Sequence, residues 1–152
     1  MLGCQSFADG PAKAIKAPDF TLTDLQGGRV TLKELKGKVV FLDFWATWCP
    51  PCVASSPEVE RLHRDYKEKK VVVLSINLDS EDKPVKRFLS THRITSRVFM
   101  AGATGIDTKY QVDGIPSFYI IDQDGFITRA WAGFGSTMSA QWRKEIDRLL
   151  KI

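Results

Sequence analysis

The chain has 152 residues, of which 43% are hydrophobic and 26% are charged, and its formal net charge is +4 at pH 7. This length predicts one domain with a hydrophobic core of its own, and the composition is ordinary for a globular protein. No window of 18 apolar residues could span a membrane, and no Lys/Arg block with interleaved aromatics indicates a nucleic-acid partner.

The N-terminal residues 1–16 are expected to form a flexible lead-in. The first four of them, Met1-Leu2-Gly3-Cys4, are too short to hold a signal peptide. Their end nevertheless resembles the end of a bacterial lipoprotein signal, in which the cysteine becomes lipidated. Cys4 is therefore either a lipid anchor or an incidental cysteine, and the sequence leaves both interpretations open.

A pattern for two short strands follows the lead-in. Residues 18–25 alternate weakly between apolar and polar side chains, and after a turn a second strand begins at 29–31. Thr31 and Glu34 fit a capping box at the start of a helix of one to two turns that ends at Gly37. We therefore expect a β-hairpin followed by a short helix.

The clearest strand signal is the apolar run 38–45, which predicts a central strand buried on both faces. A helix is expected over residues 50–69, kinked by Pro57, because apolar side chains recur on one of its faces. Residues 71–78 predict a second buried strand. The order strand, helix, strand is typical of a right-handed βαβ unit with parallel strands.

The rest of the chain alternates between helices and strands. We expect helices capped by Asp82 and Ser136, the second of them closing the chain, and between them a hairpin whose turn is Gln-Asp-Gly. The order predicts an α/β fold with a mixed sheet flanked by helices, an N-terminal β-hairpin extension and a central helix/strand insertion. The remaining elements are expected at 82–92 (helix), 97–100 (strand), 104–110 (short helix), 118–122 and 126–134 (strands).

Cys49 and Cys52 stand two residues apart at the expected start of the long helix. Cysteines at this spacing can close a small disulfide, and the free N–H groups of a helix N-terminus favour the thiolate of the first one. Pro50 and Pro51 between them supply no N–H donor but stiffen the loop. The motif predicts redox chemistry. No metal site is expected, since two scattered histidines do not complete a zinc site.

A resemblance to the thioredoxin superfamily is carried by residues 44–52, Phe-Trp-Ala-Thr-Trp-Cys-Pro-Pro-Cys, and by Gly-Ile-Pro at 114–116. It covers residues 17–152, which are expected to form one thioredoxin-like domain. Within the superfamily the chain is similar to the TlpA/ResA-type extracytoplasmic thiol–disulfide oxidoreductases, at Ala-Pro-Asp-Phe (17–20), at Leu-Lys-Gly-Lys (35–38) and in the insertion between 78 and 110.

The resemblance implies roles for five residues. Cys49 would be the exposed attacking cysteine and Cys52 the more buried resolving cysteine. Pro116 would form a cis peptide bond beside the disulfide, and Ile115 would offer backbone groups to a substrate strand. Asp43 matches the buried carboxylate that helps to deprotonate the resolving thiol.

The residues around the cysteines add two predictions of their own. Asp43 stands in an apolar run, so burial should raise its pKa toward that of a proton acceptor at neutral pH. Trp48, with Pro50 and Pro51, is expected to form an apolar surface that binds the substrate.

Two positions depart from the family pattern. Ser55 stands where many TlpA/ResA-like proteins carry a glutamate, and Ser75 lies near the place of the lysine that neighbours the buried aspartate in thioredoxins. If the glutamate assists proton transfer in relatives, this chain must use Asp43 or water instead.

The resemblance implies a thiol–disulfide oxidoreductase in the periplasm or cell envelope that reduces protein disulfides, for example in cytochrome c maturation. We expect a monomer with no cofactor beyond the Cys49–Cys52 disulfide, because no nucleotide-binding fingerprint is present, and a membrane thiol protein as electron donor. A disulfide oxidase or isomerase and a Cu(I)-binding metallochaperone-like protein remain alternatives. A peroxidase would leave the Cys-x-x-Cys pair superfluous.

Overall fold

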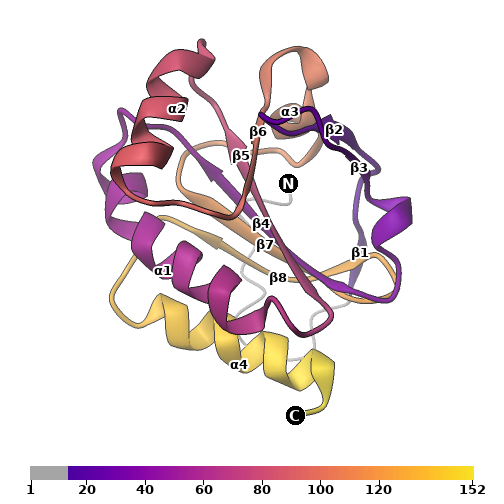
Figure 1. Cartoon of the computed structure of the whole chain (residues 1–152). Coiled ribbons are helices and arrows are strands. Elements are labelled where there is room, and N and C mark those ends of the chain that lie inside the picture. Colours follow the sequence, from indigo (N-terminus) through magenta and orange to yellow (C-terminus); the bar gives the residue numbers. More distant parts are fainter. Residues whose placement is uncertain (1–13) are drawn as a thin grey trace.

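A six-stranded mixed sheet forms the centre of the molecule (Figure 1). The computed structural model describes residues 14–152. The strand order across the sheet is β1-β8-β7-β4-β5-β6. These strands are β1 (Ile15–Lys16), β4 (Val39–Trp45), β5 (Val71–Asn77), β6 (Arg97–Met100), β7 (Ser117–Ile121) and β8 (Phe126–Ala132).

The predicted βαβ unit is confirmed at the middle of this sheet. β4 is buried along its whole length and pairs in parallel with β5, through α1 (Pro50–Tyr66). A second parallel crossover, through α2 (Asp82–Thr91), places β6 beside β5. The C-terminal hairpin β7–β8 is also confirmed, and β7 pairs antiparallel with β4. The chain therefore has the mixed α/β architecture expected from its sequence.

Helices α1 and α4 (Met138–Leu150) cover one face of the sheet (Figure 1). Because side chains alternate along a strand, Val39 and Phe41 of β4 pack under these helices, beside the fully buried Trp142. Val40 and Leu42 point to the opposite core. That core is covered by β2 (Thr21–Thr23), β3 (Arg29–Thr31), η1 (Lys33–Leu35) and α3 (Ile106–Lys109), and the exposed η2 (Gly102–Thr104) comes just before α3.

The N-terminal hairpin is confirmed as a separate two-stranded sheet of β2 and β3. Asp24, just after β2, accepts a hydrogen bond from Arg97 Nε at 3.0 Å, and the amide of Leu25 donates to Val98 O at 3.0 Å. These contacts attach the hairpin to the edge strand β6. The capping contact of Thr31 is present, since its Oγ1 accepts from the amide of Glu34 at 3.2 Å.

Several predicted boundaries were wrong by a few residues. α1 ends at Tyr66 rather than 69, because the lysine-rich segment after it turns toward β5. The N-cap of α2 is Glu81 instead of Asp82, and the N-cap of α4 is Thr137 instead of Ser136. β8 ends at Ala132 because Gly133 has a left-handed φ of 80°. These errors arise because the local sequence signals do not mark the residue at which the last backbone hydrogen bond of a helix or strand is made.

The sheet also begins earlier than the predicted domain start at residue 17. Ile15 pairs with Ile127 and Lys16 with Phe126, so β1 forms an edge strand beside β8. The sequence places this pair in the flexible lead-in, because two residues are too short to show an alternating pattern. Residues 1–13, and with them the lipid-anchor interpretation of Cys4, lie outside the described residues.

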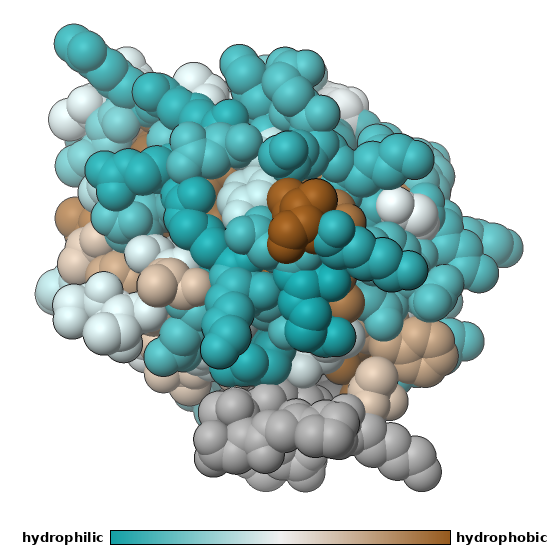
Figure 2. Space-filling view, turned by 90° about the horizontal axis from the view of Figure 1, so that it is seen from below, coloured by the Kyte–Doolittle hydropathy of each residue, from teal (hydrophilic) through white to brown (hydrophobic). Residues whose placement is uncertain are grey.

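The face that carries α4 is mostly hydrophilic, and hydrophobic groups appear on it in small patches (Figure 2). Exposed large hydrophobic side chains are few among residues 14–152: Trp48, Phe126 and Ile152. No helix within this part of the chain is long and apolar enough to cross a bilayer.

Candidate active site

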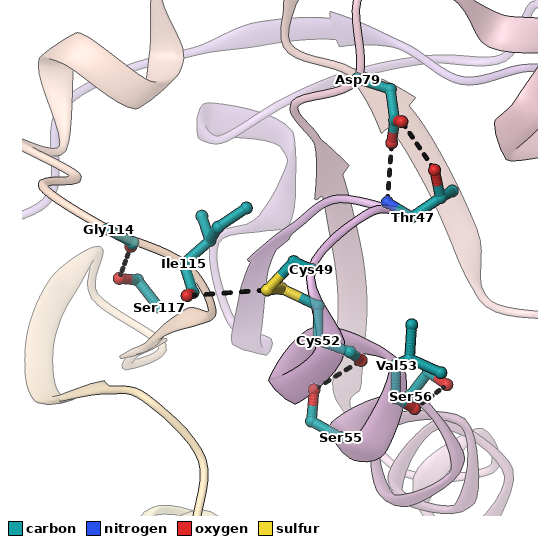
Figure 3. The surroundings of a disulfide bond; sticks show 10 residues. All are labelled: Thr47, Cys49, Cys52, Val53, Ser55, Ser56, Asp79, Gly114, Ile115 and Ser117. Carbon is teal, nitrogen blue, oxygen red and sulfur yellow. Dashed lines mark hydrogen bonds between the residues drawn. A yellow bond between two sulfur atoms is a disulfide. The ribbon is translucent and has the colours of Figure 1, made fainter.

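The two cysteines of the motif form a disulfide at the N-terminus of α1 (Figure 3). Cys49 is the N-cap residue, and its Cα lies 5.2 Å from that of Cys52. Cys49 is 5% exposed and Cys52 1% exposed. The expectation of an exposed Cys49 is therefore wrong for the disulfide form, in which both cysteines are buried, although Cys52 is the more buried of the two.

The first turn of α1 has fewer donors than an ordinary helix N-terminus. Pro50 and Pro51 occupy the first two helical positions and carry no N–H. The amide of Cys49 donates a hydrogen bond to Ala46 O at 3.3 Å. The amide of Cys52 is therefore the donor left in this turn for a Cys49 thiolate. One amide and the helix dipole stabilise the thiolate less than a full set of donors would.

The segment before β7 closes over the disulfide. The Ile115–Pro116 peptide bond is cis, as predicted. The carbonyl oxygen of Ile115 lies 3.7 Å from Cys49 Sγ, so a reduced Cys49 can donate its S–H to this oxygen (Figure 3). Ser117 Oγ donates to Gly114 O at 2.6 Å and fixes the turn. The predicted pairing of the motif with residues 114–116 is thus present in the fold.

A second loop anchors the motif from the opposite side. Asp79 accepts hydrogen bonds from the amide of Thr47 at 2.9 Å and from Thr47 Oγ1 at 2.7 Å (Figure 3). The amide of Asp79 in turn donates to Asn77 Oδ1 at 2.7 Å. We name this Thr47–Asp79 arrangement the loop clamp. Neither residue was predicted from the sequence as part of the site, although a polar residue just after a parallel strand, at the same sheet edge as the cysteines, is a usable signal.

Asp43 lies in the middle of β4 and is 4% exposed. Its register partner on β5 is Ser75, whose Oγ donates to Asp43 Oδ2 at 3.5 Å. Burial raises the pKa of Asp43 to about 7, and the weak bond from Ser75 lowers it only a little. The carboxyl group therefore changes charge near neutral pH, as a proton acceptor should.

The carboxyl group of Asp43 faces α1. Asp43, Ser56 and Val59 line one small cavity under this helix, and Trp45 of the same strand packs in one cluster with both cysteines. Ser55, at the departure from the family pattern, is buried and donates to Cys52 O at 3.0 Å. The Ser55 hydroxyl therefore makes a local hydrogen bond within α1.

The surface around the disulfide is apolar and open. Trp48 is 68% exposed, and Pro50 and Pro51 are exposed beside it. Trp45, by contrast, belongs to the core. Within residues 14–152 no group of three or more His, Cys, Asp and Glu side chains is arranged to hold a metal ion. His92 stacks on Phe88 with ring centroids 4.0 Å apart.

Comparison with known proteins gives consistent matches. The profile of the AhpC/TSA family matches residues 14–130. The thiol-disulfide oxidoreductase ResA of Bacillus thuringiensis is 38% identical over 147 residues, which are 95% of this chain and 82% of the relative. The thioredoxin-like protein YneN of Bacillus subtilis is 35% identical over 87% of this chain and 78% of its own. A crystal structure assigned to a thiol:disulfide interchange protein DsbE of Chlorobium tepidum has a TM-score of 0.84 at 32% identity, covering 93% and 99% of the two chains.

Proposed function

Because the chain belongs to the AhpC/TSA family and is a thioredoxin-like thiol–disulfide oxidoreductase similar to ResA, we propose that it reduces protein disulfides outside the cytoplasm. The observation that carries the proposal is the Cys49–Cys52 disulfide at a helix N-terminus, with the cis Ile115–Pro116 bond beside it. A static structural disulfide would need neither the adjacent Ile115 carbonyl nor the exposed Trp48.

In the first step the Cys49 thiolate attacks one sulfur of a substrate disulfide. A mixed disulfide forms, and the other substrate sulfur leaves as a thiolate. Trp48, Pro50 and Pro51 provide the apolar surface on which the substrate docks, and the backbone of Ile115 pairs with the substrate strand. The docking brings the substrate sulfur in line with Cys49, which lies just beneath this surface.

In the second step Cys52 resolves the mixed disulfide. Its proton passes to the Asp43 carboxylate, and the Cys52 thiolate attacks Cys49 Sγ. The 49–52 disulfide forms, and the second substrate sulfur leaves as a thiolate that takes a proton from solvent. Two electrons have moved from the enzyme pair to the substrate. A pKa of about 7 lets Asp43 accept the proton and release it again.

The location and the electron donor follow from redox chemistry. Protein disulfides persist mainly outside the cytoplasm, so a reductant of such bonds acts there, in the periplasm or cell envelope. The sequence has no nucleotide-binding fingerprint, and a membrane thiol protein is the donor class that fits. The Leu2-Gly3-Cys4 sequence supports a lipid anchor at Cys4. Apocytochrome c, whose haem-attachment cysteines also stand two residues apart, is the proposed substrate class.

The reduction potential of the 49–52 pair tests the direction of the reaction. We expect a value below about −200 mV, in the range of thioredoxin and the glutaredoxins. A value near the −120 mV or so of DsbA would instead identify an oxidase and contradict the proposal. The potential is measured by equilibration with glutathione and thioredoxin, with a Cys49→Ser variant as the control that cannot form the disulfide.

The substrate class needs a separate test. The reduced enzyme should reduce an oxidised Cys-x-x-Cys-His peptide of apocytochrome type faster than the same peptide with scrambled flanking residues. Equal rates with the two peptides would agree with a disulfide reductase but would contradict apocytochrome c as its substrate class. Anaerobic Cu(I) titration of the same sample separates a copper carrier, which would bind the ion without reducing either peptide.

A further inference from the structure

A small cavity lies under α1, between the sheet and the segment that leads into β6. It measures about 10 Å³, which is the space of one water molecule. The residues that line it come from β4, α1, β5, α2 and the segment before β6: Asp43, Trp45, Ser56, Val59, Glu60, Ser75, Phe88, Ile94 and Ser96.

Three of the residues that line this cavity carry a buried polar atom with no hydrogen-bond partner among residues 14–152: Asp43 Oδ1, Trp45 Nε1 and Ser96 Oγ. Their chemistry is complementary to water. The indole N–H only donates, the ionised carboxylate only accepts, and the serine hydroxyl does either. A buried water normally makes about three hydrogen bonds to such groups, and buried polar atoms without partners are rare.

We propose that Asp43, Trp45 and Ser96 bind one internal water molecule, and that this water carries the proton of the resolving step between Asp43 and the surface. In this assignment Trp45 and Ser96 are positioning residues. Trp45 donates its indole N–H to the water oxygen, the water donates to Asp43 Oδ1, and Ser96 Oγ holds the remaining hydrogen. The assignment rests on the proposed role of Asp43 as the proton acceptor for Cys52.

An open cleft of about 320 Å³ shares Ser56, Glu60 and Ile94 with the internal cavity. The proton therefore has a short path from the water site, past Ser56 and Glu60, to solvent. Cys52 stands one helical turn before Ser56, so the same helix leads from the thiol to the mouth of the path.

The other charged groups around the cavity do not compete with Asp43 for the proton. Glu60 is the other carboxylate that lines it, and its oxygens accept from Thr95, from the Ser96 amide and from Arg64. Burial alone would raise the pKa of Glu60, but these hydrogen bonds outweigh it and hold the pKa below its usual value. Glu60 therefore stays ionised and fixes the segment that carries Ser96.

The other elements around the cavity bring no titratable group to it. β5 contributes Ser75 and α2 contributes Phe88, on which His92 stacks at the cleft side. β7 places Phe118 opposite Asp43. Apart from the Cys52 thiol itself, Asp43 is therefore the group that should set the pH dependence of the resolving step.

The water itself is tested without reference to catalysis. In an NMR experiment on the oxidised chain, the indole Nε1–H of Trp45 should show a cross-peak to a long-lived water, and Ser96→Ala should weaken or remove it. Ser90→Ala, at an exposed serine of α2, is the matched control and should leave the cross-peak unchanged. A missing cross-peak in the unmodified chain would overturn the proposal.

The proton path is tested by the rate of the resolving step. Cys49 is loaded as a mixed disulfide with thionitrobenzoate, and release of the coloured thiol by Cys52 is followed from pH 5 to 9. Ser96→Ala and Trp45→Phe should each slow release about tenfold below pH 7, where Asp43 must first lose its own proton through the water, while Ser90→Ala stays at the unmodified rate. Adding Ser96→Ala to Asp43→Asn should cause no further loss, because both act on one step.

The outcomes separate two failures. If Asp43→Asn slows release but Ser96→Ala and Trp45→Phe match the unmodified chain at every pH, the water path is wrong and the role of Asp43 stands. If Asp43→Asn itself has no effect, the proposed role of Asp43 is wrong. The proton path is then also wrong, even where the cross-peak shows a bound water. Loss of rate in Ser96→Ala that is equal at all pH values would indicate a structural effect and also contradict the proposal.

Discussion

At the scale of single residues, Asp43 is the side chain that the fold accommodates at a cost. It sits in a strand that is otherwise apolar, and Ser75 offers it only one long hydrogen bond of 3.5 Å. No salt bridge to this carboxylate is found within residues 14–152. A buried carboxyl without a cation resists ionisation, which opposes folding at neutral pH but suits proton transfer.

This cost gives a pH-dependent prediction for Asp43→Asn. Well below the ordinary carboxyl range, Asp43 is protonated in both the folded and the unfolded chain. Between about pH 4 and the folded pKa of about 7, only the folded chain keeps the proton, so stability falls as pH rises. The asparagine side chain of the variant cannot ionise. We expect Asp43→Asn to raise the free energy of unfolding at pH 8 by up to about 4 kcal/mol and to change it little at pH 4.

Guanidinium denaturation of the oxidised protein at both pH values measures this difference. Asp82→Asn, at an exposed residue of α2 that pairs with Lys86, is the control and should show no comparable gain. A stability change that is the same at pH 4 and pH 8 would show that Asp43 is not the titrating group.

Trp48 is a second residue whose position suggests its role. A tryptophan that is 68% exposed beside a reactive disulfide contributes little to the core, but it offers a large apolar surface to a docking chain. Trp48→Ala should lower kcat/KM for a protein disulfide about tenfold and leave the rate with a small aromatic disulfide nearly unchanged. A parallel loss with both substrates would mean that Trp48 acts on Cys49 itself.

At the scale of elements, the active site is assembled from three loops at one end of the sheet. The loop between β4 and α1 carries the cysteines, the loop after β5 carries Asp79, and the loop before β7 carries Pro116. The loop clamp holds the first two together, and the contact of Ile115 O with Cys49 Sγ joins the third (Figure 3). Rigid strands thus place loops that by themselves have little regular structure.

Breaking the loop clamp should loosen this end of the molecule. Asp79→Ala removes the acceptor for both the amide and the hydroxyl of Thr47, so we expect a loss of about 2–3 kcal/mol in the free energy of unfolding. The Cys49 thiol of the variant should also react faster with iodoacetamide-type probes, since its loop opens more often. Unchanged stability and unchanged alkylation would contradict a positioning role for the clamp. Ser80→Ala, at an exposed residue of the same loop, is the matched control.

At the scale of the whole molecule, α4 completes the core on the α1 face of the sheet. Trp142 is fully buried, with its ring 4.9 Å from that of Phe41 and 4.6 Å from that of Phe118. Tyr66 of α1 donates its hydroxyl to Asp147 of α4 at 2.5 Å, which joins the two helices that flank the site. The C-terminal helix therefore stabilises the strand on which Asp43 lies.

Trp142→Ala should cost about 3–5 kcal/mol, because it removes a large ring from a packed core and leaves a cavity. Trp48→Ala is the matched control, with the same substitution at an exposed site and an expected change within about 0.5 kcal/mol. Urea denaturation of both variants measures the contrast. Similar losses in the two variants would show that α4 does not close the core as described.

Much of the fold was predictable because its signals are local. The apolar run of β4, the helical periodicity of α1 and the turn between β7 and β8 each lie within a few neighbouring residues, and each was confirmed. The two-residue β1 was missed, because it becomes a strand only when Phe126 and Ile127 lie beside it. Helix caps were misplaced by one residue for the same reason, since packing decides which turn is the last.

The sequence by itself determined the redox pair and its immediate chemistry. Cys49 and Cys52 at this spacing, before a helix and after a buried strand, specify a disulfide without any long-range contact. The tertiary structure alone decided what surrounds that pair. The contact of Ile115 with Cys49 and the loop clamp each join residues 32 or more positions apart. The internal cavity brings together residues of several elements, among them the three with unpartnered atoms. Such contacts depend on strand register and helix packing, which no local pattern of side chains encodes.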